Sequence, residues 1–139
     1  MDKAKVIRRL NEALERELTE VVRYMHQSFW VSGRNAKAMR AFFREQSSES
    51  MGHATRLGEH IVALGGKPVV RILEIYEPKA MSNRAMLEEC IQHEQEACDG
   101  YTRLLPLVKG DAKLTRLVGS LAKEEGEHIA GIRKMAKRL

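Results

Sequence analysis

The C-terminal part of this chain carries a regular apolar stripe that a glutamate and a histidine interrupt. Its apolar side chains recur at alternating steps of three and four residues, which places them on one face of a helix. This face comprises Leu114, Val118, Leu121, Glu125, His128, Ile132, Met135 and Leu139. Glu125 and His128 therefore point into a core, where a polar group is costly unless it is paired or binds a metal. The rest of the chain must therefore supply polar partners for Glu125 and His128, or further ligands for a metal.

The composition favours helices packed on helices. The chain has 139 residues, of which 43% are hydrophobic, 31% charged and 5% aromatic, with three prolines. This length suits one domain over residues 1–139, and the few turn residues favour an all-α bundle over a β protein. No apolar run is long enough to span a membrane, and no signal-peptide pattern opens the chain. We therefore expect no membrane partner.

The two cysteines indicate a reducing compartment. Cys90 and Cys98 are eight positions apart in one expected helix, too far to form a disulfide. Unpaired thiols favour the cytoplasm, and we expect Cys98 to be a small buried residue. The net charge of +5 would permit nucleic-acid binding. However, the basic residues are spread along all segments without a basic face, so we expect a solvated surface and no nucleic-acid partner.

The helical period recurs along the chain. Helices are expected over residues 3–31, 36–64, 82–108 and 112–139. Ser82 is an expected N-cap, and Pro106 is expected to kink or shorten the third helix. The first and last connections are short, whereas residues 67–79 form a long linker with two prolines. Short, long and short connections predict an antiparallel four-helix bundle with one long crossover between the second and third helices.

The two halves of the chain carry matching polar residues on their inward faces. The first half has Glu17 in its first helix and His53 in its second, 36 positions later. The second half has Glu94 and His128, 34 positions apart. Together with Glu125, these side chains should meet at one height in the bundle. Three carboxylates and two imidazoles cannot neutralise one another as a buried ion-pair network, and they suit a pair of cations such as iron or manganese.

The motif of the second helix is incomplete. A dinuclear carboxylate site usually takes a Glu from each of two helices and a Glu-x-x-His from each of the other two. Residues 125–128 fit this pattern, but Ser50 occupies the carboxylate position before His53. Either the site is simply degraded there, or Glu49 substitutes for the missing ligand. Glu49 sits about 100° round the helix from Ser50, so it could serve only if the helix bulges or rotates.

The sequence resembles the ferritin-like superfamily, and within it is similar to bacterioferritin. The resemblance covers nearly the whole chain and is carried by residues 10–18, Tyr24, residues 51–57, Glu94 and residues 124–129. It implies an iron-binding protein that oxidises Fe(II) with O₂ or peroxide at a di-iron site, for iron storage or detoxification. It further implies haem b held between two subunits. The implied roles are terminal ligands for Glu17 and Glu94, a bridging ligand for Glu125, one-iron ligands for His53 and His128, and a haem axial ligand for Met51.

Two alternatives to a ferroxidase stay open. One is a non-catalytic haem-binding dimer, used in electron transfer or in haem and iron handling, with a degraded metal site. The other is a peroxide reductase resembling rubrerythrin, although the chain has no Cys-x-x-Cys pair for a rubredoxin-type donor. Tyr24 is either a core residue or a redox-active one. The family's short C-terminal helix has no counterpart here, which favours a homodimer, or a shell formed only with a complete partner subunit.

Overall fold

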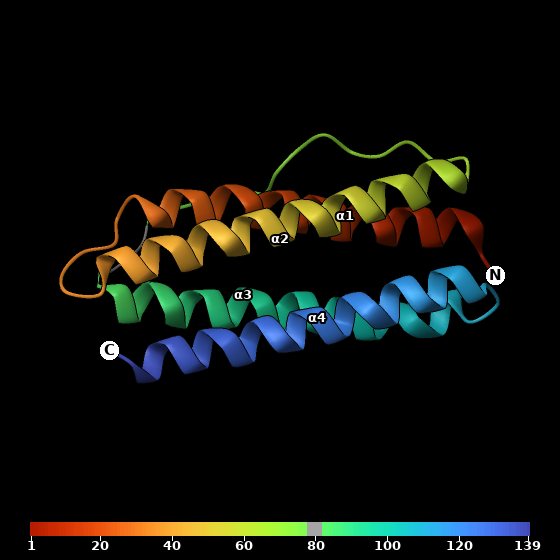
Figure 1. Cartoon of the computed structure of the whole chain (residues 1–139). Helices are drawn as coiled ribbons and strands as arrows, with labels where there is room; N and C mark the ends of the chain where they lie inside the picture. Colours follow the sequence, from red (N-terminus) through yellow and green to blue (C-terminus); the bar gives the residue numbers. More distant parts are fainter. Residues whose placement is uncertain (78–81) are drawn as a thin grey trace.

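The structure, a computed structural model, describes residues 1–77 and 82–139, and within them it is an all-α four-helix bundle (Figure 1). Its elements are α1 (Lys3–Ser28), α2 (Ala36–Ala63), α3 (Asn83–Leu104), the short 3₁₀ helix η1 (Leu105–Val108) and α4 (Ala112–Lys137). The predicted fold class is confirmed. None of these helices is long and apolar enough to cross a membrane.

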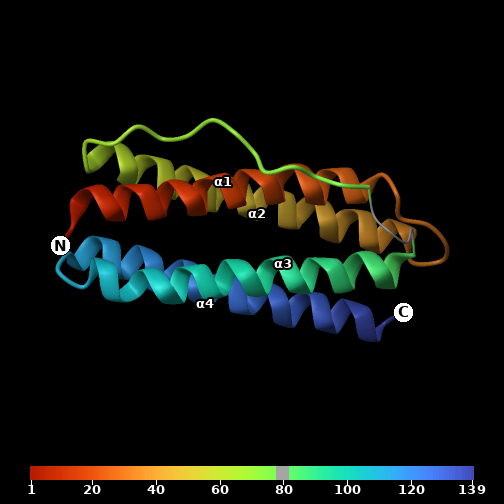
Figure 2. The same ribbon diagram turned by 180° about the vertical axis from the view of Figure 1, so that it is seen from behind.

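The bundle consists of two helical hairpins joined by a long linker. α1 packs mainly on α2, and α3 mainly on α4. Figures 1 and 2 show the linker returning along the first hairpin, so that α2 and α3 run in the same direction. Asn11 and Thr19 of α1 hold it in place. The Asn11 amide donates to the Lys67 carbonyl at 3.0 Å, and the Thr19 hydroxyl accepts from the Leu73 backbone N–H at 2.8 Å.

The described part of the linker agrees with the predicted crossover between the second and third helices. Pro78 and Lys79, the last two residues of the predicted linker, lie outside the described residues.

The helix ends follow local chemistry. The side chains of Asp2, Ser82 and Asp111 each accept a hydrogen bond from the backbone N–H three residues later, which satisfies a free donor of the first turn. The expected N-cap at Ser82 is therefore present. α3 ends at Leu104, four residues earlier than expected, because Pro106 has no N–H to continue the α-helical ladder and the chain tightens into η1. α1 ends at Ser28 rather than at residue 31.

A polar band divides the core into two apolar clusters. One cluster includes Leu10, Leu57 and Leu121, and the other includes Phe43 and Leu87. Along every long helix, a buried stretch with Glu or His separates the positions that contribute to each cluster. Apolar packing on both sides therefore fixes the height and direction of the polar side chains between them.

The core differs from the expectation at Cys98. Cys98 is partly exposed, and Ala97 and Cys90 are buried on α3 instead. At this level of α3 the inward side chain is therefore Ala97 rather than Cys98, while Glu94 and Tyr101 on either side are buried. Both cysteines are free thiols.

Candidate metal centre

The polar band brings together the five inner residues that the sequence singled out. Glu17 comes from α1, His53 from α2, Glu94 from α3, and Glu125 and His128 from α4. Each glutamate is 1% exposed, and the two histidines are 5% and 7% exposed. All four helices therefore contribute to one buried cluster.

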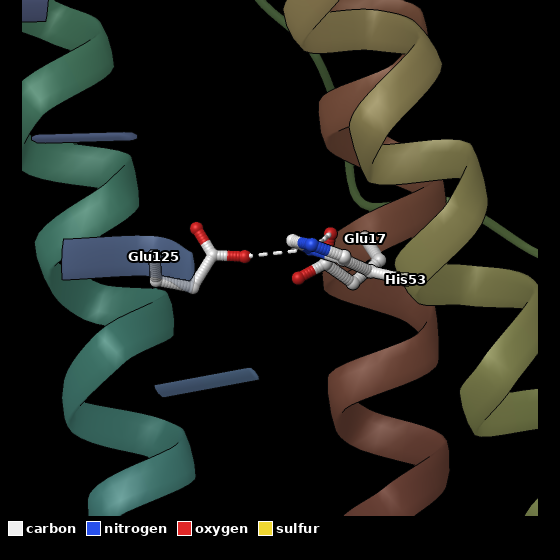
Figure 3. Close-up of side chains that lie close together, drawn as sticks. All are labelled: Glu17, His53 and Glu125. Atoms are coloured by element: carbon white, nitrogen blue, oxygen red, sulfur yellow. Dashed lines mark hydrogen bonds and ion pairs between the residues drawn. The ribbon is translucent and has the colours of Figure 1, made fainter. Parts of the chain in front are cut away.

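The cluster contains two sets of candidate ligands that share one carboxylate. The first set is Glu17, His53 and Glu125, and the second is Glu94, Glu125 and His128. Within each set, one ligand atom per residue lies within 4.8 Å of the others. Figure 3 shows Glu125 reaching from α4 across the bundle toward His53, with Glu17 beside the imidazole.

Glu125 presents one oxygen to each set. Its Oε1 lies 3.1 Å from Nδ1 of His53, and its Oε2 lies 3.5 Å from Nδ1 of His128. The terminal carboxylates face the same ring nitrogens, because Glu17 Oε2 is 3.4 Å from Nδ1 of His53 and Glu94 Oε2 is 3.4 Å from Nδ1 of His128. This is the arrangement of a carboxylate that can bridge two cations.

Two tyrosines hold the terminal carboxylates in a crossed pattern. The Tyr24 hydroxyl donates to Glu94 Oε1 at 2.5 Å, and the Tyr101 hydroxyl donates to Glu17 Oε1 at 2.8 Å. Burial raises the pKa of both tyrosines well above its usual value, so both remain donors. Tyr101 was not among the site residues predicted from the sequence, although it follows Glu94 by seven residues, as Tyr24 follows Glu17.

The remaining ligand atoms suit a cation. The Oε2 atoms of Glu17 and Glu94 and Nδ1 of His128 are buried without a hydrogen-bond partner among the described residues. Such orphaned groups are costly unless something binds them. Carboxylate oxygens with imidazole nitrogens suit hard to borderline divalent ions such as Fe(II) or Mn(II). The residues present therefore fit a pair of such ions.

The protonation of the cluster reflects its crowding. Burial alone would lower the pKa of each histidine, but the carboxylates of Glu125 and of a terminal glutamate beside each ring raise it, to about 10 for His53 and about 11 for His128. Burial and the neighbouring Glu94 raise the pKa of Glu125 to about 9. Burial also opposes ionisation of Glu94, but hydrogen bonds from its neighbours lower its pKa overall. In the absence of metal, protons on His53, His128 and Glu125 therefore offset the negative charge of the remaining carboxylates.

A second layer of carboxylates contacts the outer edge of each histidine. Glu49 of α2 contacts Nε2 of His128, and Glu124 Oε2 of α4 lies 3.4 Å from Nε2 of His53. Arg56 in turn donates to Glu124 at 2.8 Å. Carboxylates in this position orient a ligand histidine and leave its other nitrogen free for the metal.

Glu49 is thus placed on the outer nitrogen of His128 rather than at the position of the missing ligand. Its side chain is 43% exposed and belongs to neither ligand set. α2 runs as a regular helix through this region, and Ser50 points inward at 1% exposure. The bulge that Glu49 would need in order to replace the carboxylate is therefore absent from α2.

A pocket of about 490 Å³ leads from the surface to the histidines. It opens between α2 and α4, and its lining includes Glu49, Arg56, Glu124 and Glu127. The histidine side of the cluster therefore has access to solvent, while the tyrosine side is closed.

Glu20 is a buried carboxylate that the sequence analysis missed. It follows Glu17 by one helical turn, is 3% exposed and forms an ion pair with Arg23. Its Oε2 has no hydrogen-bond partner among the described residues. Burial raises its pKa to about 8, although Arg23 opposes the rise. Its spacing from Glu17 and Tyr24 on one helical face was the available signal.

Met51, the implied haem ligand, lies outside the cluster. It follows the inward Ser50 on α2, and its side chain is 49% exposed. It is therefore free to contact a second molecule.

A four-helix bundle with one long crossover and a buried cluster of carboxylates and histidines is typical of the ferritin-like di-metal proteins. The comparisons with known proteins agree. Residues 7–139 match the family model described as the ferritin-like domain, and the chain belongs to this family. Bacterioferritin from Desulfovibrio desulfuricans is 29% identical over 132 residues, which span 91% of this chain and 72% of that relative.

Two solved structures are also similar to this chain. A protein from Bacillus anthracis described as ferritin-like and diiron-carboxylate aligns over 98% of both chains, with a TM-score of 0.91 and 27% identity. Rhodobacter capsulatus bacterioferritin, described with a metal-free dinuclear site and a haem iron, aligns over 96% of this chain and 84% of its own, with a TM-score of 0.84 and 27% identity. The expected ferritin-like fold, similar to that of bacterioferritin, is thereby confirmed.

Proposed function

We propose that this protein binds two Fe(II) ions in the cluster and oxidises them, for iron storage or detoxification. The observation that carries the proposal is Glu125, whose two carboxylate oxygens face Nδ1 of His53 and Nδ1 of His128. A shared carboxylate between two ligand sets holds two cations close enough to act together.

Two Fe(II) ions give up two electrons, and O₂ takes them up with two protons to leave as hydrogen peroxide; peroxide is the other candidate oxidant. The residues of this chain bind the two ions and orient the ligand side chains. Tyr24 and Tyr101 fix the terminal carboxylates, and Glu49 and Glu124 fix the imidazoles. The pocket between α2 and α4 provides a route for iron and oxidant to the histidines.

The two ligand sets should bind iron unequally. Glu125 and His128 lie three residues apart on one helix, so the second set has two of its three ligands on a single rigid element. The first set takes each of its ligands from a different helix. Ser50 supplies no second bridging carboxylate, which leaves more uncompensated positive charge when both ions are bound. We expect the Glu94, Glu125 and His128 set to bind the tighter ion.

Anaerobic Fe(II) titration followed by stopped-flow oxidation tests the proposal. Wild-type protein should bind about two irons per chain and oxidise them, whereas Glu94→Ala should lose oxidation. Glu96→Ala is a matched control, because Glu96 is exposed on the same helix. The proposal fails if wild-type protein takes up no Fe(II), or if Glu94→Ala oxidises iron as fast as the control variant does.

A second candidate function is haem binding by a homodimer in the cytoplasm. The half-exposed Met51 favours it, because a thioether at the surface of α2 could meet its symmetry mate across a two-fold axis. Purified protein would then show a Soret band that disappears in Met51→Leu, and light scattering would give a dimer. A Soret band that survives in Met51→Leu would exclude this methionine as the ligand.

A further inference from the structure

A second pocket on the same face of the bundle is basic. Its volume is about 450 Å³, and it lies between α2 and the first turns of α4. Its lining consists of Arg56, His60, Lys113, Arg116, Leu117 and Ser120. Three of these residues are permanent cations and none is a carboxylate, in contrast to the acidic pocket above the metal centre.

The positive charge of this pocket is poorly compensated. Lys113 and Arg116 lie in the first two turns of α4, where the helix dipole disfavours cations. Among the described residues, neither forms an ion pair, and the acidic residue at this end of α4 is the N-cap Asp111. Arg56, the third cation, is paired with Glu124. A site that gathers cations against the helix dipole gains stability when an anion enters it.

The pocket also offers several fixed hydrogen-bond donors. Arg56 donates from Nη2 to Ser120 Oγ at 3.0 Å, which holds the guanidinium at the wall of the pocket. His60 donates from Nδ1 to the Arg56 carbonyl oxygen at 2.9 Å, so its neutral ring has no N–H left for an anion. The donors of the pocket are therefore those of Arg56, Lys113, Arg116 and the Ser120 hydroxyl. A planar guanidinium, an ammonium and a hydroxyl around one small space match a tetrahedral oxyanion.

We propose that this pocket binds an oxyanion of the inorganic phosphate class. Arg56, Lys113 and Arg116 favour an anion there, while Leu117 and the aliphatic stems of these side chains form the apolar part of its wall.

Arg56 connects this pocket to the metal centre. It lines both pockets, and its Nη1 donates to Glu124, whose Oε2 faces Nε2 of His53. A bound oxyanion would share the guanidinium with Glu124. The occupancy of the basic pocket therefore acts on a carboxylate that orients one candidate ligand of the metal.

Isothermal titration of metal-free protein with inorganic phosphate at low ionic strength tests the proposal independently of iron chemistry. Lys113→Gln/Arg116→Gln should bind phosphate at least about tenfold more weakly than wild type, because it removes two charge-assisted contacts. The matched control is Arg133→Gln/Lys134→Gln, which removes the same charge from exposed positions of the same helix. The control should retain wild-type affinity.

Three outcomes would overturn the proposal: no phosphate binding by folded wild-type protein, an equal loss in both double variants, or no loss in either. Sulfate should compete with phosphate at the same site. A parallel titration with duplex DNA separates a compact site from an extended basic surface. Binding of DNA through Lys113 and Arg116 without binding of phosphate would also contradict it. Circular dichroism confirms that each variant is folded.

Discussion

The imidazole rings of His53 and His128 lie stacked, with their centroids 5.3 Å apart and their planes 10° from parallel. One ring comes from α2 and the other from α4, so the contact joins the two helical hairpins. Each ring turns Nδ1 toward the inner carboxylates and Nε2 toward an outer one. The pair therefore forms the boundary between the buried cluster and the pocket that opens to solvent.

The shared position of Glu125 predicts a graded loss of metal. Glu125→Gln should abolish binding of both ions, because the carboxylate belongs to both ligand sets. Glu17→Gln should remove only the weaker ion and leave about one per chain. Equilibrium dialysis with Fe(II) or Mn(II), followed by elemental analysis, measures the stoichiometry. Equal stoichiometry in the two variants would argue against a bridging role for Glu125.

A carboxylate at position 50 should strengthen metal binding and lower the stability of the metal-free protein. Ser50→Glu places a further carboxylate on the inward face of α2, where Ser50 is buried. Without metal, this change should cost about 1–3 kcal/mol of stability, and with metal the rise in Tm should exceed that of wild type. Differential scanning calorimetry with and without Mn(II) measures both. Ser48→Glu is the control, because Ser48 is exposed on the same helix and should show neither effect.

Metal binding should release protons and strengthen with rising pH. The pKa of about 10 for His53, about 11 for His128 and about 9 for Glu125 means that all three bind protons at pH 7 in the metal-free protein. A metal needs the neutral imidazoles and the carboxylate, so it must displace these protons. Affinity should therefore rise about tenfold per pH unit for each displaced proton between pH 6 and 8. Calorimetry in buffers of different ionisation enthalpy counts the protons, and a count of zero would contradict this assignment.

The buried Glu20 predicts a pH-dependent cost in stability. Its pKa in the folded chain, about 8, lies above the ordinary value of 4.5, so the fold favours its protonated form. Its contribution to stability is present below about pH 4.5 and is lost as pH rises through 8. Glu20→Gln should therefore gain stability relative to wild type between pH 5 and pH 9, on the order of a few kcal/mol.

Urea unfolding at several pH values measures this difference. Glu12→Gln is a suitable control, because Glu12 pairs with Arg9 three residues away but is half exposed. Its stability relative to wild type should stay flat over the same range. A flat difference for Glu20→Gln as well would mean that Glu20 is ionised by its contact with Arg23.

Replacing each of the two tyrosines distinguishes a positioning role from a redox role. Tyr24→Phe and Tyr101→Phe each remove a hydroxyl that donates to a terminal carboxylate, so both should weaken metal binding, by about 1–3 kcal/mol. If Tyr24 is also redox-active, electron paramagnetic resonance after oxidation should show a tyrosyl signal that is lost only in Tyr24→Phe. No signal in wild type would leave Tyr24 with a positioning role alone.

The fold and the five-residue inner cluster could be predicted from the sequence, because inward side chains recur with the helical spacing of three and four residues. The stripe through Glu125 and His128, and the matching Glu and His of the first half, identify which side chains face inward. The crossed contacts of Tyr24 and Tyr101 depend on which helices are neighbours, and spacing within one helix does not specify that. The exposure of Cys98 was missed for a different reason, because Ala97 and Cys98 both border the apolar face of α3 and the spacing does not decide between them.

The second layer of carboxylates and the basic pocket were harder to predict from the sequence. From the sequence, Glu49 was a possible replacement ligand and Glu124 had no assigned role. Their contacts with the outer nitrogens of the histidines require the packing of α2 against α4. Arg56 and Lys113 lie far apart in a sequence whose basic residues are spread evenly. Only the return of α4 alongside α2 places them in one pocket.

The division of the ligands between the two hairpins has a consequence for assembly. The first hairpin holds Glu17 and His53, and the second holds Glu94, Glu125 and His128. No complete first set exists until the hairpins have docked, so an ion bound there acts as a clamp across their interface. Under the proposed function, metal binding and structural integrity are therefore linked: a chain with both ions bound resists separation of its two hairpins more than a metal-free chain does.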